Sequence, residues 1–473
     1  MHPSGLILSV IAVALLSSSC KHPPRFQRPA VETPPHWRWS VAEPKDHVPR
    51  GRWWQIFDDP ALDSVQREAA TGNLDLQAAL ARVEQARAVA RINRSDFLPT
   101  LQSPTAFNRY RTSGHAPSPV PFPIPSFTQQ QWAIPFDLSY ELDLWGRVRR
   151  SFEGAQQLAL GAESARQGVL LSLQAEVAAT YFSLKTARRE IDILTQAIRL
   201  RREALQIFEQ RRTAGIGSEF EVKRGRVEVS SAEADLSGAQ RRRAEYLNAL
   251  ALLAGKAPAG FEPLLTESET PLPEIAPDLP SSLLERRPDV AQAERELASR
   301  FAQVGVAKVA AFPSVRLTAA GGILSGELSD LFLWDSRTWS IGPQVSFPVF
   351  AGGRNKANLA KARAAYEEGI ALYRQKVLVA FREVEDSLAA LHYLRGEASA
   401  RGTAAEAAAQ AARLSLERYQ AGAVNFLEVV DSENARLLNE LARVRVAHEQ
   451  RLATVRLVKA LGGGWEQPSD KLN

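Results

Sequence analysis

The residue types that most often perform catalysis or bind metals are scattered through this chain of 473 residues. No histidine pair stands at metal-ligand spacing, and Gly255-Lys256 lacks the glycine and the Ser or Thr of a phosphate-binding loop. Adjacent acids such as Glu367 and Glu368 are typical of a solvated helix face. The sequence therefore predicts no enzyme, no cofactor and no metal site. The seven histidines are His2, His22, His36, His47, His115, His392 and His448.

Cys20 is the only cysteine, and its position resembles that of the lipidated cysteine of a bacterial lipoprotein. It follows Leu6–Leu16, an apolar run too short to span a bilayer, as in a signal peptide. Two features depart from the usual pattern: Ser17 replaces leucine three positions before the cysteine, and the first residues contain no Lys or Arg. The alternative is a plain signal peptide with an incidental cysteine. Lys21, rather than aspartate, follows and favours the outer membrane.

The formal charge of +5 is spread along the chain. Basic clusters such as Arg188-Arg189, Arg201-Arg202 and Arg241-Arg242-Arg243 lie on predicted helices without interleaved aromatic residues. A groove for nucleic acid would need such stacking residues. We therefore expect solvated helix faces and no nucleic-acid partner.

The chain repeats itself, which sets its domain organisation. Asn73–Leu76 corresponds to Arg287–Val290 at an offset of 214 residues, and Ala214-Gly215 corresponds to Ala421-Gly422 at an offset of 207. Each repeat reads as a helix, a β-hairpin, a long helix and a shorter returning helix. The expected segments are a signal peptide at 1–19, a lipidated segment at 20–62, a first repeat at 63–255 with its hairpin at about 100–144, a Pro-rich linker at 256–281, a second repeat at 282–462 with its hairpin at about 313–350, and a tail at 463–473.

Two stretches alternate strictly between apolar and polar residues, from Trp132 to Leu144 and from Trp339 to Val349. This period of two predicts strands with one apolar, aromatic-rich face. A soluble sandwich also alternates, but four strands per chain leave open edges that three chains, with about twelve strands, would close into a barrel. The residues that we expect to face lipid are Trp132, Ile134, Phe136, Leu138, Tyr140, Trp339 and Ile341.

Two proline-free stretches, from Gly146 to Arg212 and from Gly353 to Gln420, predict helices of roughly sixty residues, or about 90 Å each. Apolar and small residues in the second stretch fall at heptad spacing, which packs helices side by side. Each long helix should end at a glycine turn, Gly215 or Gly422. A soluble coiled coil is the alternative, but with strands at one end the helices are better explained as a tube that continues the barrel.

Several long motifs resemble the outer membrane factor family, whose members are TolC-like. They are Trp53–Leu62, Gln77–Arg82, Tyr140–Arg147, Leu283–Val290, Trp339–Pro343 and Phe347–Arg354. The resemblance covers the whole mature length, and lipidated members that serve drug pumps are most similar. It implies a mixed α+β membrane protein, a homotrimer with a twelve-stranded transmembrane β-barrel in the outer membrane lipid and an α-helical barrel in the periplasm. A periplasmic adaptor (a membrane fusion protein) and an inner-membrane transporter of the RND type would complete the pump, and the duct would be passive.

The resemblance also implies a gate at the periplasmic end. The stretch from Tyr419 to Asp431 matches the family's aperture region and assigns its two acids to Glu428 and Asp431. The 207-residue offset makes Glu221 and Arg224 their counterparts. The arginine that the best-known family pattern has at Val424 is missing. The alternative is an ordinary helix start, where acids interact favourably with the helix dipole.

A second class of function, a periplasmic adaptor or coiled-coil scaffold, predicts one helical hairpin, no duplication and no alternating aromatic strands. The sequence has the opposite of each feature. It indicates no particular substrate, because selection in such pumps lies mostly in the transporter.

Overall fold

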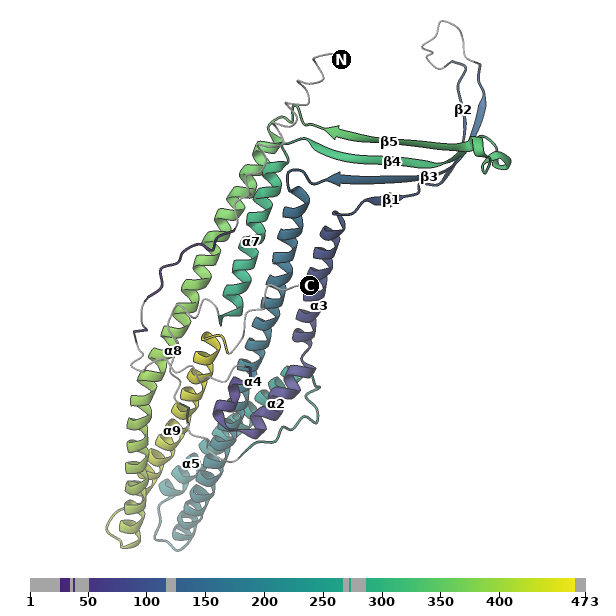
Figure 1. Cartoon of the computed structure of the whole chain (residues 1–473). Coiled ribbons are helices and arrows are strands. Elements are labelled where there is room, and N and C mark those ends of the chain that lie inside the picture. The colour runs from purple at the N-terminus through teal and green to yellow at the C-terminus, as the bar shows by residue number, and fades with distance from the viewer. Residues whose placement is uncertain are drawn as a thin grey trace. The chain divides into compact units, whose positions relative to one another are not determined.

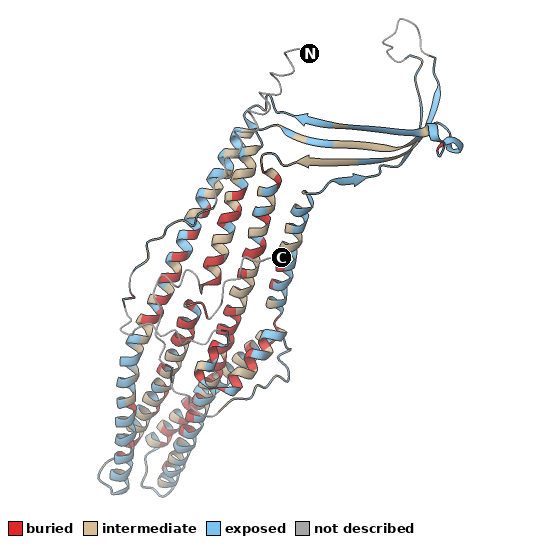
Figure 2. Ribbon diagram, viewed as in Figure 1, coloured by how far each residue is buried: buried red, intermediate tan, exposed pale blue. Residues whose placement is uncertain are grey.

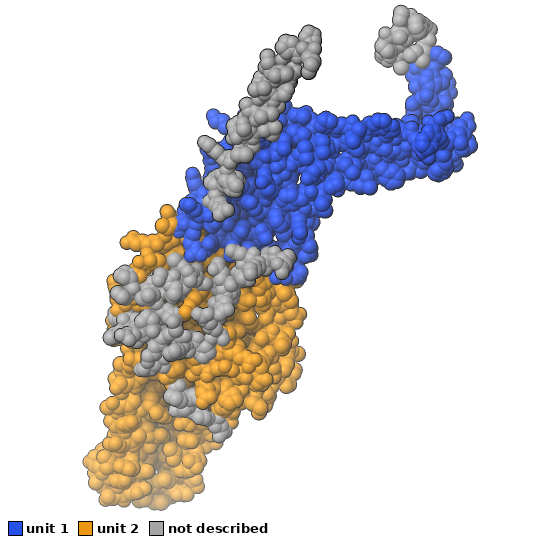
Figure 3. Space-filling view, in the orientation of Figure 1, with its two compact units in different colours: residues 1–29, 84–160, 294–372 blue, residues 30–83, 161–293, 373–473 orange. Residues whose placement is uncertain are grey.

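The computed structural model describes residues 26–34, 37–38, 51–115, 125–266, 272–273 and 286–463. Cys20, the expected signal peptide and part of the expected linker lie outside these ranges. The chain forms two compact units (Figure 3). Unit 1 comprises residues 1–29, 84–160 and 294–372, and unit 2 comprises residues 30–83, 161–293 and 373–473. Each unit therefore combines segments from both halves of the sequence.

The order helix, β-hairpin, long helix, returning helix occurs twice along the chain (Figure 1). The first half contains η1 (Trp53–Phe57), α2 (Pro60–Gly72), α3 (Leu74–Ser95), β1 (Thr100–Gln102), β2 (Ala106–Arg111), β3 (Thr128–Leu142), α4 (Arg147–Thr213) and α5 (Glu219–Leu253). The second half contains α7 (Pro288–Val309), β4 (Ser314–Ser325), η3 (Leu328–Asp330), η4 (Trp334–Ser336), β5 (Arg337–Ser346), α8 (Arg354–Gln420) and α9 (Phe426–Ala460). The expected mixed α+β, internally duplicated fold is confirmed.

The long helices α4 and α8 have 67 residues each, and the returning helices α5 and α9 have 35 each. Sixty-seven residues correspond to about 100 Å of helix. Both long helices end in the same turn, with Gly215 at φ +76° and Gly422 at φ +73°. In each turn the next amide donates to a carbonyl five residues back, the pattern that a left-handed glycine allows at a helix end. Among the described residues, every helix is too short or too polar to cross a membrane.

The sheet has five strands where four were expected. β1 and β2 replace the single first strand, and both pair antiparallel with β3, at Asp137–Ser139 and Thr128–Ala133 respectively. The interruption falls at Pro104, which has no amide hydrogen for the ladder. The sheet therefore still has four lateral positions, in the order β1 (or β2), β3, β4, β5.

Within unit 1, the helices lie in the same lateral order as the strands to which they connect. Arg300 of α7 donates to Glu368 of α8 at 2.8 Å, and Arg295 of α7 donates to Gln157 of α4 at 3.1 Å. Ser151 of α4 contacts Asn93 of α3 at 2.7 Å. The helix order is thus α3, α4, α7, α8, beneath the strand order β1, β3, β4, β5 (Figure 1).

Unit 2 has its own apolar core, which the N-terminal aromatic motif helps to form. Trp53 is completely buried and donates from Nε1 to Gln174 of α4 at 3.1 Å. Phe57 packs edge-on against Phe182 of α4 at 4.8 Å between ring centroids. This packing explains why an aromatic cluster precedes the first helix.

Candidate functional site: the sheet face and the hairpin tips

The strand register gathers the apolar side chains of three strands on one face of the sheet. Opposite residues in an antiparallel pair share a face, so the even positions of β3 lie beside the odd positions of β4 and β5. The rows across β3, β4 and β5 on this apolar face are Leu142–Val315–Val345, Tyr140–Leu317–Pro343, Leu138–Ala319–Ile341, Phe136–Gly321–Trp339 and Ile134–Ile323–Arg337. All seven residues predicted to face lipid therefore belong to one continuous face.

Several of the largest side chains on this apolar face are not covered by any described residue. The exposed fractions are 52% for Phe136, 80% for Trp339 and 77% for Ile341. In Figure 2 the strands are exposed or intermediate along their length, whereas buried residues concentrate in the helices. At the far end of this face, Phe107 of β2 contacts Trp132 with ring centroids 4.2 Å apart.

The opposite face of the sheet is polar. Its rows include Asp137–Ala320–Ser340, Ser139–Thr318–Gly342 and Glu141–Arg316–Gln344. The sheet therefore has one polar and one apolar face, and both are uncovered within the described part of the chain. This is the arrangement of a wall between apolar surroundings and water.

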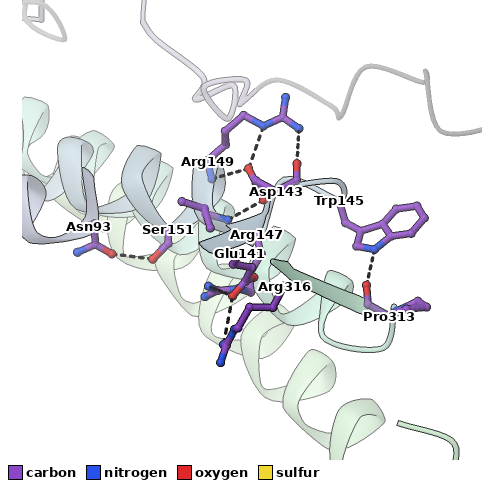
Figure 4. Close-up of polar contacts among 10 residues, drawn as sticks. Asn93, Glu141, Asp143, Trp145, Arg147, Arg149, Ser151, Pro313 and Arg316 are labelled. Atoms are coloured by element: carbon purple, nitrogen blue, oxygen red, sulfur yellow. Dashed lines mark hydrogen bonds and ion pairs between the residues drawn. The ribbon is translucent and has the colours of Figure 1, made fainter. Parts of the chain in front are cut away.

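The junction between β3 and α4 is rigidly tied by polar contacts (Figure 4). Glu141 binds Arg147 through two hydrogen bonds of 2.7 and 2.9 Å. The Asp143 carboxylate accepts from the backbone amides of Val148 and Arg149 at 2.9 and 3.0 Å and so caps α4. These contacts explain the acidic and basic residues of the motif from Tyr140 to Arg147.

The same junction is also tied to the second half of the chain. Trp145 donates from its indole to the carbonyl oxygen of Pro313 at 2.6 Å, and its ring stacks on Phe312 at 5.1 Å between centroids. Pro313 immediately precedes β4, so the strand-to-helix junction of the first repeat is held against the helix-to-strand junction between α7 and β4 in the second (Figure 4).

The two helical hairpins of unit 2 meet at their tips through aromatic and polar contacts. Phe208 of α4 packs edge-on against Phe426 of α9 with centroids 4.3 Å apart. Arg211 of α4 donates to the hydroxyl of Tyr419 of α8 at 2.8 Å. Gly225 of α5 lies so close to Phe208 that an added Cβ would be 3.1 Å from its ring. The tips are thus packed against each other within one chain.

The four predicted gate residues are present at these tips, but they do not form one cluster. Arg224 binds Asp431 across α5 and α9 at 3.2 Å. Glu428 instead binds Arg418 of α8 at 2.7 Å. Glu221 closes the capping box of α5, where it accepts from the amide of Ser218 at 2.9 Å. The two acids at equivalent positions therefore have different partners, one a backbone amide and the other an arginine.

Sequence reasoning missed Arg418 as the partner of Glu428. It also missed a polar cluster further along the same helices, where Arg201 of α4 binds both Glu228 of α5 and Asn434 of α9. Asn434 donates to Glu228 at 3.1 Å. The only available signal was charge at helix positions with no obvious partner within their own helix.

Glu190 of α4 is a buried acid that joins three helices. Arg242 of α5 and Arg445 of α9 donate to its two carboxylate oxygens at 2.6 and 2.7 Å. Burial raises the pKa of this carboxyl, but the hydrogen bonds from the two arginines outweigh it, so the net pKa lies below the ordinary 4.5. The Glu190 carboxylate is therefore ionised at neutral pH, and it holds α5 and α9 against α4.

Asp59 performs a comparable task at the start of α2. Its carboxylate caps the helix through the amide of Ala61 at 3.1 Å, and it accepts from the hydroxyl of Tyr181 and from the ammonium of Lys185. Burial raises its pKa, but hydrogen bonds from Thr266 and Lys185 bring the net value below the usual 3.8. The ionised Asp59 carboxylate therefore holds the N-terminal motif against α4.

Known proteins resemble the chain over nearly its whole length. The family model described as outer membrane efflux protein matches residues 65–256 and 279–463. The outer membrane protein OprJ of Pseudomonas aeruginosa is 34% identical over 463 residues, which cover 97% of this chain and 96% of that protein. The solvent efflux pump outer membrane protein SrpC of Pseudomonas putida is 32% identical, with 95% of this chain and 97% of that protein covered. The solved outer-membrane channel OprN is 30% identical with a TM-score of 0.86, covering 95% of this chain and all of the other.

Proposed function

The chain belongs to the outer membrane efflux protein family, and from this premise we propose that three copies of it form one passive export duct. Membership makes it an outer-membrane efflux channel rather than a periplasmic adaptor. The observation that best supports the trimer is the shared lateral order of strands and helices in unit 1, with both the sheet and the helix layer open at the same two edges. A sheet edge with unpaired backbone groups needs a partner.

The edges of unit 1 expose apolar side chains as well as backbone. At one edge, Ile92 of α3 is 66% exposed, and at the other, Leu372 of α8 is 53% exposed. Joining the edge of one copy to the opposite edge of the next is a heterologous contact, which closes a ring when the rotation fits. Three copies then provide about twelve lateral strand positions, within the range of outer-membrane barrels.

The apolar face of the sheet has the height of a lipid bilayer in such a barrel. Ten residues separate Trp132 from Leu142, which is about 34 Å of strand. At the tilt of about 40° found in outer-membrane barrels this becomes about 26 Å, and the apolar band of such barrels is about 25 Å tall. The apolar face therefore fits the lipid, and the polar face fits the water-filled lumen.

Cys20 is proposed to carry the lipid anchor, and the contacts of the residues after it support this. Phe26 packs against Phe301 of α7 with ring centroids 6.0 Å apart, and Arg28 binds Glu294 of the same helix at 2.7 Å. Six residues of chain, from Cys20 to Phe26, span at most about 20 Å. From Phe301 to the sheet end of α7 at Val309 is only about 12 Å of helix. The anchor can therefore reach the membrane surface near the start of β4.

The helices are proposed to extend into the periplasm, where an adaptor and an inner-membrane RND-type transporter complete a tripartite pump. SrpC is named as part of a solvent efflux pump, and by analogy we propose small molecules as the exported class. The ion pairs Arg224–Asp431 and Arg418–Glu428 join different helices at the tips, which supports a closed resting gate there, with Glu221 fixing the start of α5.

Channel activity can be tested directly with the purified, full-length mature protein. We expect it to fractionate with outer membranes, to require detergent for extraction and to produce discrete conductance steps in a planar lipid bilayer. A protein that fractionates with the soluble periplasm and adds no conductance would contradict the proposal and favour an adaptor or scaffold.

A further inference from the structure

Arginines follow the apolar face of the sheet at the end away from the helices. Arg109 and Arg111 of β2 pair with Gln130 and Thr128 of β3, so they share the face of Phe107 and Trp132. Arg337 of β5 lies on the same face, in the row of Ile134 and Ile323. We call these three residues the basic girdle.

The basic girdle spans the end of the apolar band near Trp132. Rows on one face of a sheet are about 7 Å apart along a strand. Arg109 and Arg111 lie one and two rows beyond Trp132, and Arg337 lies one row before it. With the apolar band in lipid, all three guanidinium groups are then within reach of the headgroups, because long basic side chains extend toward the interface. In Figure 1, β2 and the start of β3 form the segment that leaves this end of the sheet.

The charges of the basic girdle are not neutralised by the described part of the chain. Within it, none of the three arginines forms an ion pair, although Glu327, Asp330 and Asp335 occupy the nearby turn between β4 and β5. Arg111 donates to the Ser126 hydroxyl at 3.1 Å, and Arg337 lies over the ring of Trp334 at 3.7 Å. A guanidinium stacked on an indole keeps its N–H edges available to an anion.

The aromatic neighbours of Arg337 point to a lipid rather than to a soluble anion. Trp334 is 74% exposed and Trp339 is 80% exposed. Two uncovered indoles beside a free arginine, at the end of an apolar face, match the composition of a membrane interface, where tryptophan is enriched. A site for a free anion in water would not need such an apolar surround.

We propose that the basic girdle binds the phosphate groups of phosphorylated lipids in the leaflet at the strand ends farthest from the helices. The inference rests on the proposed function, because it needs the apolar face to lie in lipid. Guanidinium groups bind phosphate through paired, charge-assisted hydrogen bonds. β5 and β2 lie at opposite edges of the sheet, so ring closure places the strand of Arg337 in one copy next to the strand of Arg109 and Arg111 in the next. Each junction between copies then carries arginines of the basic girdle from both copies.

The test compares lipid binding by the wild-type trimer and by R337Q and R109Q variants, counted by native mass spectrometry. The probes are bis-phosphorylated lipid A and the same lipid after enzymatic removal of its phosphates. We expect the wild type to prefer the phosphorylated form, and each variant to lose about tenfold in affinity for it, the usual effect of losing one hydrogen bond to a charged group. R316Q is the matched control, because Arg316 lies on the polar face of the same sheet, and it should bind like the wild type.

Several outcomes would overturn the inference. Equal binding of the two lipid forms, equal binding by wild type and R337Q, or an equal loss in R316Q would each do so. Inorganic phosphate is added as a competitor: displacement of the lipid at matched phosphate concentrations would identify a free-anion site instead. All variants are also inserted into phosphatidylcholine bilayers. Normal conductance with unselective lipid binding would remove only this inference, whereas absence of wild-type conductance would remove the proposed function.

Discussion

Arg224 and Asp431 occupy equivalent positions in the two halves of the chain, 207 residues apart, and they bind each other at 3.2 Å. Equivalent positions that are related by rotation about an axis can touch only where they lie close to that axis. In the proposed ring of three copies, we therefore expect this ion pair to lie at the narrow, closed end of the duct. The Glu428–Arg418 pair lies one helical turn away on α9.

Neutralising the two acids should loosen the closed end. Exposed ion pairs contribute about 0.2 to 1 kcal/mol each, so loss of two pairs in three copies should shift the balance toward the open state by about 1 to 6 kcal/mol. We expect the E428Q/D431N variant to show higher single-channel conductance and weaker cation selectivity in a planar bilayer. E417Q is the control, because within the described part of the chain Glu417 pairs with Arg413 of its own helix, α8. Unchanged conductance and selectivity in the double variant would exclude a gate at these residues.

Acidification should weaken the contact of α5 and α9 with α4 through Glu190. A folded-state pKa below the ordinary 4.5 means that the stabilisation is fully present above about pH 4.5 and is lost as the pH falls through the lower, folded value. In the wild type, the temperature of heat-induced dissociation should therefore decrease when the pH is lowered below about 4.5. In E190Q it should be lower at pH 7 and vary less with acid; an identical pH profile for both proteins would refute the role of this carboxylate.

Gly255 should tolerate no side chain. An added Cβ would lie 2.0 Å from the carbonyl oxygen of Gly72, and the residue has φ +68°. We expect G255A to destabilise the protein by roughly 2 to 4 kcal/mol. The matched change G402A adds a methyl group to a helical position with open space, and it should stabilise by about 0.5 to 1 kcal/mol. Denaturation temperatures in detergent measure both effects, and equal temperatures for G255A and wild type would show that the contact is relaxed.

A charge at the middle of the apolar face should impair membrane assembly. Ile341 lies in the central row with Leu138 and Ala319, and lysine at the bilayer midplane of a barrel costs roughly 2 to 4 kcal/mol. We expect I341K to lower the assembled fraction in outer membranes, measured by its resistance to extraction. S340K places the same charge one residue away on the polar face and should assemble normally. If the two variants assemble equally, the assignment of faces is wrong.

The regular elements of this fold could be predicted from the sequence. Alternation from Trp132 onward predicted β3, and the absence of proline predicted α4 and α8 almost to the residue. These features depend on local periodicity, which one chain reveals by itself. Pro104 was also visible in the sequence, but the strand pattern around it was too weak to show that β1 and β2 are separate.

The ion pairs between helices could not be predicted from the sequence, because they depend on contacts between distant segments. Arg418 and Glu428 belong to different helices, and so do Glu190, Arg242 and Arg445. A charged residue on a predicted helix has the same appearance whether it is solvated or bound by another helix. The contact of Phe26 with Phe301 likewise needed the structure, and it supports the proposed lipid anchor at Cys20.

The most direct test of the trimeric duct is the mass of the detergent-extracted mature protein, measured by size-exclusion chromatography with multi-angle light scattering after subtraction of the bound detergent. The chain has a mass of 52.0 kDa before processing, and a trimeric duct predicts a single species with the mass of three mature chains. A monodisperse single chain that stays in solution without detergent would contradict it.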